Sequence, residues 1–205
     1  MRKVAIVLAV TILVAATAQA SPLNVSATGS VYFNGVGAPP LSGVLSGETA
    51  TMSFQVDSDD WVELAPGDVR GYVIDNSTFS LSFTGGVAVG LAPGTAYFCL
   101  VDGFPVSDGF FVSASATSPG GVPLTQDPVQ FNLDLGYEGD TLTSLDIIDA
   151  KGVYAFDGLT RFGMGLWQIF PDNVVMGIEF EYLSIANEPV SVDESSWSRV
   201  KAMYR

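Results

Sequence analysis

Apolar and polar residues alternate one by one in several separate stretches of this 205-residue chain. In VQFNLDL, residues 129–135, every second residue is apolar, and residues 51–57, 78–83 and 176–183 follow the same rule. A period of two places the apolar side chains on one face of a β-strand, whereas an α-helix needs a period near 3.6. No convincing helical period interrupts the chain before its last residues, so an all-β fold is predicted.

Turn-forming Gly and Pro residues separate these segments at intervals of about 8–15 residues, which is typical of a sandwich of short strands. We therefore predict about nine to eleven strands in an antiparallel β-sandwich, either jelly-roll-like or immunoglobulin-like. The Ser/Pro/Gly-rich residues 117–127 are expected to form a long loop. The further strand candidates are residues 24–33, 71–74, 87–91, 95–101, 109–116, 152–156 and 165–170.

The N-terminus has the layout of a secretory signal peptide. Arg2 and Lys3 precede an apolar run, and Ala18-Gln19-Ala20 supplies a small-x-small cleavage site. The run is short for a membrane span of about 20 residues. We expect cleavage after Ala20 and a mature protein without a membrane span, in the periplasm, on the cell surface or outside the cell. The predicted organisation is a signal peptide at 1–20, a β-sandwich domain at 21–187 and a C-terminal tail at 188–205.

The chain is strongly acidic, with 22 Asp and Glu residues against 8 Lys and Arg residues and a net charge of −14. Loss of the signal peptide removes two of the basic residues. Such a surface repels nucleic acid and anionic lipid, and it suits solubility, divalent cations or cationic partners. We therefore expect no nucleic-acid partner.

Several catalytic chemistries are excluded by composition. The chain has no His, which removes Ser-His-Asp triads and His-ligated zinc. Its single cysteine, Cys99, lies in an apolar run and is expected to be a buried small hydrophobe that forms no intrachain disulfide. A hydrolase that uses two carboxylates remains an alternative, because 22 acids offer many pairs. We predict a non-enzymatic protein without catalytic residues.

The acidic segment DSDDW and the residues after it are the best candidate for a cation site. Ca²⁺ takes six to eight oxygen ligands, which clustered carboxylates in a loop supply. The spacing fits no EF-hand, and a solvated acidic loop is the alternative. We therefore predict no cofactor, with Ca²⁺ as the ion that the sequence allows. The candidate ligands are Asp57, Asp59, Asp60, Glu63 and Asp68, and a second, weaker set is Asp134, Glu138 and Asp140.

Trp61 directly follows the acidic cluster and is the candidate ligand-binding residue. An exposed ring beside carboxylates is the arrangement of a calcium-assisted sugar site, in which the ring stacks on the sugar. Most aromatic residues of a sandwich lie in its core, which is the alternative for each of them. The other aromatic candidates are Tyr72, Tyr97, Tyr137, Tyr154 and Trp167.

The segments VSATGSVYF, LSGVLSGETATMSFQVDSD and GDVRGYVIDNSTFSLSFTGG, about residues 24–90, resemble exported bacterial proteins of the PEP-CTERM type. The resemblance implies a secreted β-sandwich and no catalytic residue. Val56 replaces the Tyr of the family's Phe-x-Tyr-Asp element. Asn187-Glu188-Pro189-Val190 is followed by no apolar helix, so the usual C-terminal anchor of that family is missing.

The chain ends instead in the basic and aromatic sequence SSWSRVKAMYR. Spacings of three and seven residues place its apolar side chains on one face of a short amphipathic helix, although so short a helix is marginal in water. We interpret this tail as a sorting or docking element, with a frayed end as the alternative. The residues assigned to it are Trp197, Arg199, Lys201, Tyr204 and Arg205.

Together these patterns predict a secreted, non-enzymatic β-sandwich protein with a role in the envelope, the matrix or surface interaction. The alternative is a carbohydrate-binding or adhesive module, with or without Ca²⁺. The expected partners are a polysaccharide, an envelope component or sorting machinery.

Overall fold

The computed structural model describes residues 22–65, 67–103, 107–115 and 120–187. These residues form one twelve-stranded sheet whose strand pairings are all antiparallel. Their one helical element is the single 3-10 turn η1, Leu41–Gly43. The strands are β1 Pro22–Asn34, β2 Thr49–Ala65, β3 Val69–Ile74, β4 Ser80–Phe83, β5 Ala88–Val89, β6 Tyr97–Val101, β7 Asp108–Ser113, β8 Val122–Pro123, β9 Val129–Tyr137, β10 Gly152–Ala155, β11 Leu159–Gln168 and β12 Val174–Ala186.

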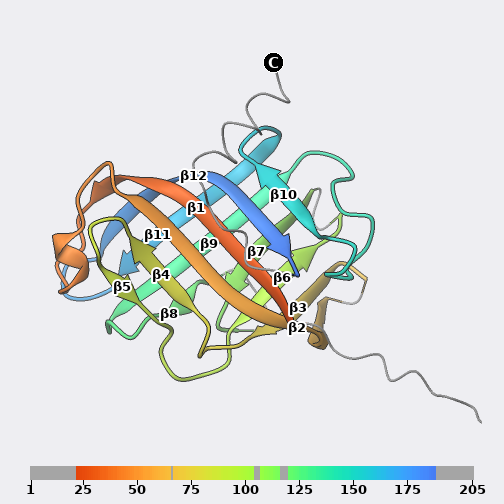
Figure 1. The fold of residues 1–205 in the computed structure, drawn as a ribbon, viewed down its shortest axis with the longest axis horizontal. Helices are drawn as coiled ribbons and strands as arrows, with labels where there is room; N and C mark the ends of the chain where they lie inside the picture. The colour runs from red at the N-terminus through yellow and green to blue at the C-terminus, as the bar shows by residue number, and fades with distance from the viewer. Residues whose placement is uncertain (1–21, 66, 104–106, 116–119, 188–205) are drawn as a thin grey trace, which may run out of the picture.

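The sheet closes on itself because β1 pairs with β2 along one edge and with β12 along the other. The closed path runs β1, β12, β11, β9, β7, β6, β3 and β2, while β4 with β5, β8 and β10 extend from β2, β9 and β12. In Figure 1, β1 and β2 pass in front of β9 and β11 at a large angle to them. The result is two layers of strands around one main core.

The two layers are joined by β2 and β12, which belong to both. β2 pairs with β1 through residues 49–57 and, after an irregular stretch, with β3 through residues 61–65. β12 pairs with β11 through residues 174–177 and with β1 through residues 176–186. Long strands that switch layers in this way form the corners of orthogonally packed sheets. The prediction of an all-β, antiparallel β-sandwich is therefore confirmed.

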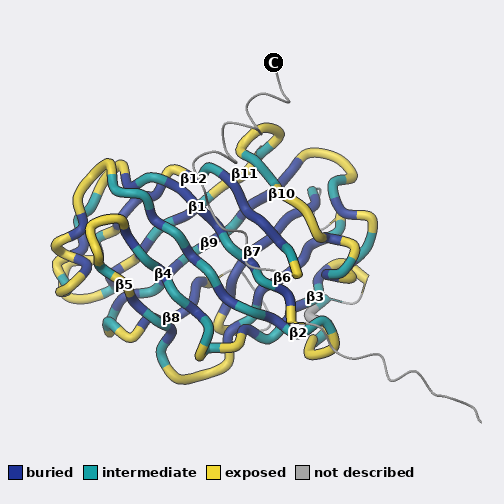
Figure 2. The backbone as a smooth tube through the Cα atoms, viewed as in Figure 1, coloured by how far each residue is buried: buried dark blue, intermediate teal, exposed yellow. Residues whose placement is uncertain are grey.

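The alternation in the sequence is matched by alternating burial. Residues 129–135 of β9 switch between buried and intermediate positions, as Figure 2 shows along the strand. The buried rings join the layers: Phe54 on β2 meets Phe98 on β6 edge to face at 5.6 Å, and Phe98 stacks on Phe110 of β7 at 5.8 Å. Such aromatic pairs add stability beyond the area that they bury.

The loop between β9 and β10 closes one end of the core. Leu142, Leu145 and Ile147 of this loop are buried in the main core. The hydroxyl of Tyr72 donates a hydrogen bond to the Leu145 carbonyl at 2.7 Å and accepts one from the Ile147 N–H at 2.9 Å. One buried hydroxyl, which donates one hydrogen bond and accepts another, therefore holds the loop over the core.

The main difference from the predicted strands lies in residues 117–127, which were expected to be loop. Val122 and Pro123 pair with β9 as β8, which raises the strand count to twelve. A strand of two residues is too short to show alternation, and Pro disfavours a strand prediction because it donates no backbone hydrogen bond.

Candidate functional site

The acidic residues 57–63 lie within β2 and not in a loop, which corrects the sequence-based expectation. Val56 lies opposite Ile74 and Trp61 lies opposite Tyr72, so the residues between them bulge out of the ladder with β3. Such a bulge keeps the segment within the sheet while its unpaired residues leave the regular register. Sequence patterns do not distinguish this arrangement from an acidic loop.

Two carboxylates of this segment are hydrogen-bonded to neighbouring backbone groups. Asp57 Oδ1 accepts a hydrogen bond from the Asp59 N–H at 2.9 Å, and Glu63 Oε1 accepts one from the Gly67 N–H at 3.2 Å. Among the described residues, these carboxylates do not belong to the group of three that lies within ligand distance of one another. The structure therefore does not gather the predicted ligands into one cation site.

A different acidic group does come together, formed by Asp102, Asp108 and Asp140. One carboxylate oxygen from each lies within 4.8 Å of the others. Asp102 follows β6, Asp108 begins β7 and Asp140 follows β9. Because β7 pairs with both β6 and β9, the ends of these strands meet at one edge of the sheet. We call these residues the acidic triad, and oxygen ligands of this kind suit Ca²⁺.

Asp108 is the structural centre of the acidic triad. It is only 2% exposed, and its two oxygens accept hydrogen bonds from the Gly103 N–H at 2.9 Å and the Leu142 N–H at 2.6 Å. Two backbone N–H donors thus satisfy both oxygens of this buried carboxyl group. Asp108 thereby ties the loop after β6 to the loop after β9.

The carboxyl group of Asp102 lies close to several other negative charges. Burial and then the negative charges of Asp108, Asp140 and Asp68 raise the pKa of its carboxyl. The Asp102 N–H also donates a hydrogen bond to the Asp68 carbonyl at 3.0 Å. Asp68, a predicted ligand from the acidic segment, therefore lies beside the acidic triad and apart from Asp57 and Asp59.

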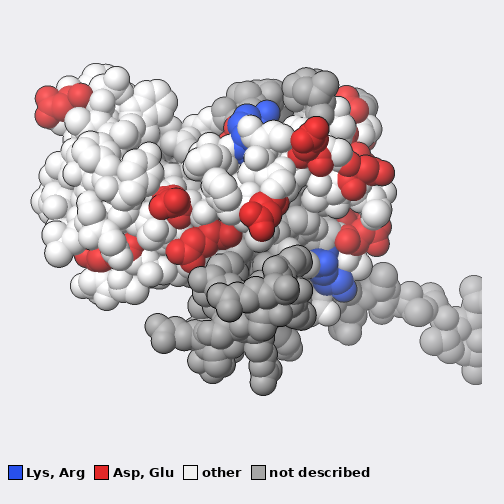
Figure 3. Space-filling model, turned by 90° about the horizontal axis from the view of Figure 1, so that it is seen from above, with Lys and Arg blue, Asp and Glu red and all other residues white. Residues whose placement is uncertain are grey.

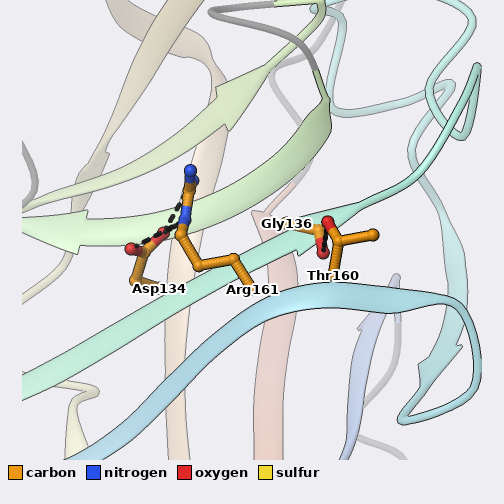
Figure 4. A network of polar contacts seen from close by, with 4 residues as sticks. All are labelled: Asp134, Gly136, Thr160 and Arg161. Atoms are coloured by element: carbon orange, nitrogen blue, oxygen red, sulfur yellow. Dashed lines mark hydrogen bonds and ion pairs between the residues drawn. The ribbon is translucent and has the colours of Figure 1, made fainter.

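Asp140 was predicted as a ligand together with Asp134 and Glu138, and the structure separates the three. Asp134 forms an ion pair with Arg161 across β9 and β11, with Nε 3.0 Å from Oδ2 (Figure 4). Glu138 is exposed.

Asp102 was not proposed from the sequence, because Asp102-Gly103 has the composition of an ordinary turn and only strand register brings it next to β9.

Trp61 is 41% exposed, and one face of its ring is covered by a cation. The guanidinium carbon of Arg70 lies 4.0 Å from the ring centroid, which is a cation–π contact. Trp61 therefore offers only its other face to a ligand.

A larger exposed apolar surface lies at the opposite end of the strands. We call it the uncharged aromatic end, and Figure 3 shows that the left end of the molecule carries few charged side chains while both signs gather at the centre and right. It is formed by the end of β1, the start of β12, the end of β11 and the loops beside them. Its exposed apolar members are Tyr32, Phe33, Leu45, Trp167, Phe170 and Val175.

The strand register sets the arrangement of this end. An irregularity in the ladder between Val31 and Phe33 leaves Tyr32 as an extra residue opposite β12. The Tyr32 ring lies over Gly177, where any Cβ atom would collide with it. On the neighbouring strand, the Trp167 indole N–H donates a hydrogen bond to Asn173 Oδ1 at 2.6 Å. These contacts fix the two exposed rings before any partner arrives.

Gln168 holds the loops of this end together. Its side chain is buried, and its Oε1 accepts hydrogen bonds from the N–H groups of Gly37 at 2.9 Å and Ala38 at 3.2 Å. Its Nε2 donates to the Phe170 carbonyl at 2.8 Å. The loop after β1 is thereby attached to the turn that presents Phe170.

Other candidate aromatic residues belong to the interior. Tyr72 and Tyr137 are buried in the main core and Tyr154 packs against it. Tyr97 packs against a smaller cluster that contains Val69, Val101, Phe111 and Cys99.

Cys99 is fully buried, as predicted, and burial raises its pKa to about 12. This thiol is therefore protonated and unreactive near neutral pH.

No protein-family model matches this chain, and neither a curated protein nor a solved structure matches it significantly. The resemblance to PEP-CTERM-type proteins stays a prediction. The predicted signal peptide and the tail residues Trp197, Arg199, Lys201, Tyr204 and Arg205 lie outside the described residues. Within the described part of the chain, no helix is long and apolar enough to cross a membrane.

Proposed function

We propose that this chain is an exported, non-enzymatic β-sandwich protein that contacts an envelope or matrix component through its uncharged aromatic end. The observation that carries the proposal is the gathering of exposed aromatic and aliphatic side chains at one end of a protein with a net charge of −14. Contiguous exposed apolar surface marks interaction sites in soluble proteins. Export is supported by the layout of the first twenty residues.

Retention on sedimented envelope material from the producing cells tests this proposal. Tyr32→Ser with Phe170→Ser removes two of the most exposed rings, and we expect the variant to stay in the supernatant. Phe156→Ser with Phe162→Ser is the matched control, because these rings are also exposed but lie outside the uncharged aromatic end. Equal retention of both variants, with unchanged thermal unfolding, would contradict the proposal.

A carbohydrate partner is the second candidate, favoured by the groups around Trp167. Strand register places Gln130 opposite Trp167, and Asn132 opposite the nearby Gly165. An exposed aromatic ring beside amide donors and acceptors suits a neutral sugar, whose apolar face stacks on the ring while its hydroxyls bond to the amides. A glycan array tests this candidate: binding that is lost in Trp167→Ala but kept in Trp61→Ala assigns it to this end. Loss only in Trp61→Ala would move the site to β2.

The acidic triad is the proposed ligand set for Ca²⁺. Because the triad lies at the opposite end of β9 from Gln130 and Trp167, its ion would stabilise the domain and would not touch a sugar at Trp167. The tail is proposed to be read by sorting machinery or to dock on the domain. Fractionation of cells that produce the chain without residues 195–205 tests sorting, since normal export and surface retention would contradict it.

A further inference from the structure

One part of β12 is covered on both faces. Four consecutive residues, Tyr182–Ile185, are buried, although alternation along a strand exposes every second residue when one face meets water. Figure 2 shows this last part of β12 in the colour of buried residues. Leu183 and Ile185 belong to the main core. Tyr182 and Ser184 therefore point to the outside of the sheet, where they are only 8% and 2% exposed.

Thr28 on the neighbouring strand belongs to the same outer face. It pairs with Tyr182, while the adjacent Ala27 pairs with Leu183 in the core. Thr28 is 3% exposed, and its Oγ1 has no hydrogen-bond partner in the part of the chain that the structure describes. A buried hydroxyl without a partner costs stability, so a polar group from a covering segment is expected beside it.

The described strands do not supply that cover, because they all lie in the sheet itself. The closest candidate in the chain is the segment that continues from β12. Asn187 follows the strand directly and its carbonyl accepts a hydrogen bond from Asn24 Nδ2 at 3.0 Å. From there, residues 188–205 remain. The return from Asn187 to Tyr182 is five residues along the strand, about 17 Å, which is short relative to the length of this segment.

The chemistry of the segment matches the face. Glu179 is exposed and Glu181 partly exposed on β12 beside the buried patch. The first half of the segment carries three acidic residues, Glu188, Asp193 and Glu194, whereas its last seven residues, 199–205, carry Arg199, Lys201 and Arg205 and no acid. The basic end of the segment is therefore opposite in sign to the carboxylates at the edge of a patch whose centre is uncharged, and such complementarity fixes orientation in a docked complex.

We propose that the C-terminal segment, residues 188–205, folds back across the outer face of β12 and β1. Trp197, Val200 and Tyr204 cover Tyr182, Ser184 and Thr28, and the indole N–H and the phenol hydroxyl of the two aromatic side chains are the polar groups available to Thr28 Oγ1. The basic residues of the segment lie near Glu179 and Glu181. This inference rests on the docking alternative proposed for the tail, and it does not depend on binding at the uncharged aromatic end, which is a separate surface.

A nitroxide spin label in the full-length mature protein tests the docking. The label is attached to Lys201→Cys, while the fully buried Cys99 stays unlabelled. We expect paramagnetic loss of the amide signals of Ser26, Thr28 and Val153, whereas those of Tyr32 and Trp167 persist. No selective loss, or loss centred on other strands, would overturn the proposal.

Charge reversal supplies the second arm. Glu179→Lys with Glu181→Lys is expected to restore the lost signals at least several-fold in intensity, as is high salt. Asp127→Lys with Asp172→Lys is the matched control at exposed positions in the loops before β9 and β12, and it should leave the pattern unchanged. Identical patterns in both variants would contradict the electrostatic contact.

A mixed sample separates docking within one chain from docking between copies. Isotope-labelled protein without the nitroxide is combined with unlabelled protein that carries it. We expect no signal loss in this sample. Loss of the Thr28 and Val153 signals would show that the segment binds a second copy, which overturns docking within the chain.

Discussion

The guanidinium of Arg70 stacks on the ring of Trp61, with 4.0 Å between the guanidinium carbon and the ring centroid. The two residues lie on paired strands, where Glu63 is opposite Arg70 and Trp61 opposite Tyr72. The contact places the cation over an exposed ring. It identifies Trp61 as a structural partner of β3, in addition to its candidate role toward a ligand.

Removal of this contact should have a small effect. Arg70→Ala is expected to lower the free energy of unfolding by about 0.5–1 kcal/mol, the range of exposed cation–π pairs. Urea unfolding measures the change, and Arg70→Lys is the control that keeps the charge. A double-mutant cycle with Trp61→Ala that gives no coupling would contradict the assignment.

Asp108→Ala should be much more harmful than substitutions elsewhere in the acidic triad. It leaves the N–H groups of Gly103 and Leu142 without acceptors, and each buried orphan donor costs about 1–3 kcal/mol. Asp140→Ala is the matched control, because Asp140 is exposed. Equal unfolding midpoints for the two variants in urea would show that Asp108 does not anchor the loops.

The raised pKa of Asp102 predicts a pH-dependent effect. Because the folded pKa lies above the unfolded one, the folded protein binds this proton more tightly, and the associated stability is lost as pH rises through the folded pKa. Asp102→Asn should therefore be more stable than the wild type at pH 7. The difference should shrink toward about pH 4, near the unfolded pKa of Asp. A gain that is independent of pH would contradict this origin.

Calcium provides a further test of the acidic triad. If the triad binds the ion, millimolar Ca²⁺ raises the Tm of the wild type, since a ligand that binds only the folded state stabilises it. Asp140→Asn should abolish the rise, while Asp59→Asn on β2 should retain it. A rise lost only in Asp59→Asn would instead support the acidic segment predicted from the sequence.

Tyr72→Phe tests the loop that closes the core. The substitution removes one hydroxyl that bonds to both Leu145 and Ile147, so a loss of about 1–3 kcal/mol is expected. Hydrogen exchange should accelerate at the Ile147 amide in particular. Tyr154→Phe is the comparison, because its hydroxyl donates one hydrogen bond, to the Ala150 carbonyl. Protection of Ile147 that survives Tyr72→Phe would contradict the role of this hydroxyl.

The sequence was most informative where a strand has one face in the core. Residues 129–135 of β9 illustrate this, since apolar and polar residues alternate there and burial alternates with them. The same rule did not predict that residues 57–63 continue β2, because a bulge interrupts both the apolar–polar alternation and the pairing with β3. β8 was missed since two residues hold no period.

The candidate sites depend on strand order, which the sequence does not state. Asp102 and Asp140 are 38 positions apart in the sequence. They come together because β6 and β9 both pair with β7, so that the residues after these two strands lie at the same end of the sheet. The uncharged aromatic end likewise joins Tyr32 on β1 to Trp167 on β11 through the intervening β12. Local patterns indicate which side chains face outward, but register decides which of them become neighbours.

The double pairing of β1 has a consequence for how the molecule is assembled. Its partner β12 is the last of the described strands to be synthesised, so the pairing between Asn24 and Ala186 forms only after residue 186 has been made. Contacts between such distant positions make folding slow. Without β12, β1 would keep β2 as a partner but would have no strand along its other edge, so the ring of strands can close only once this distal segment is available.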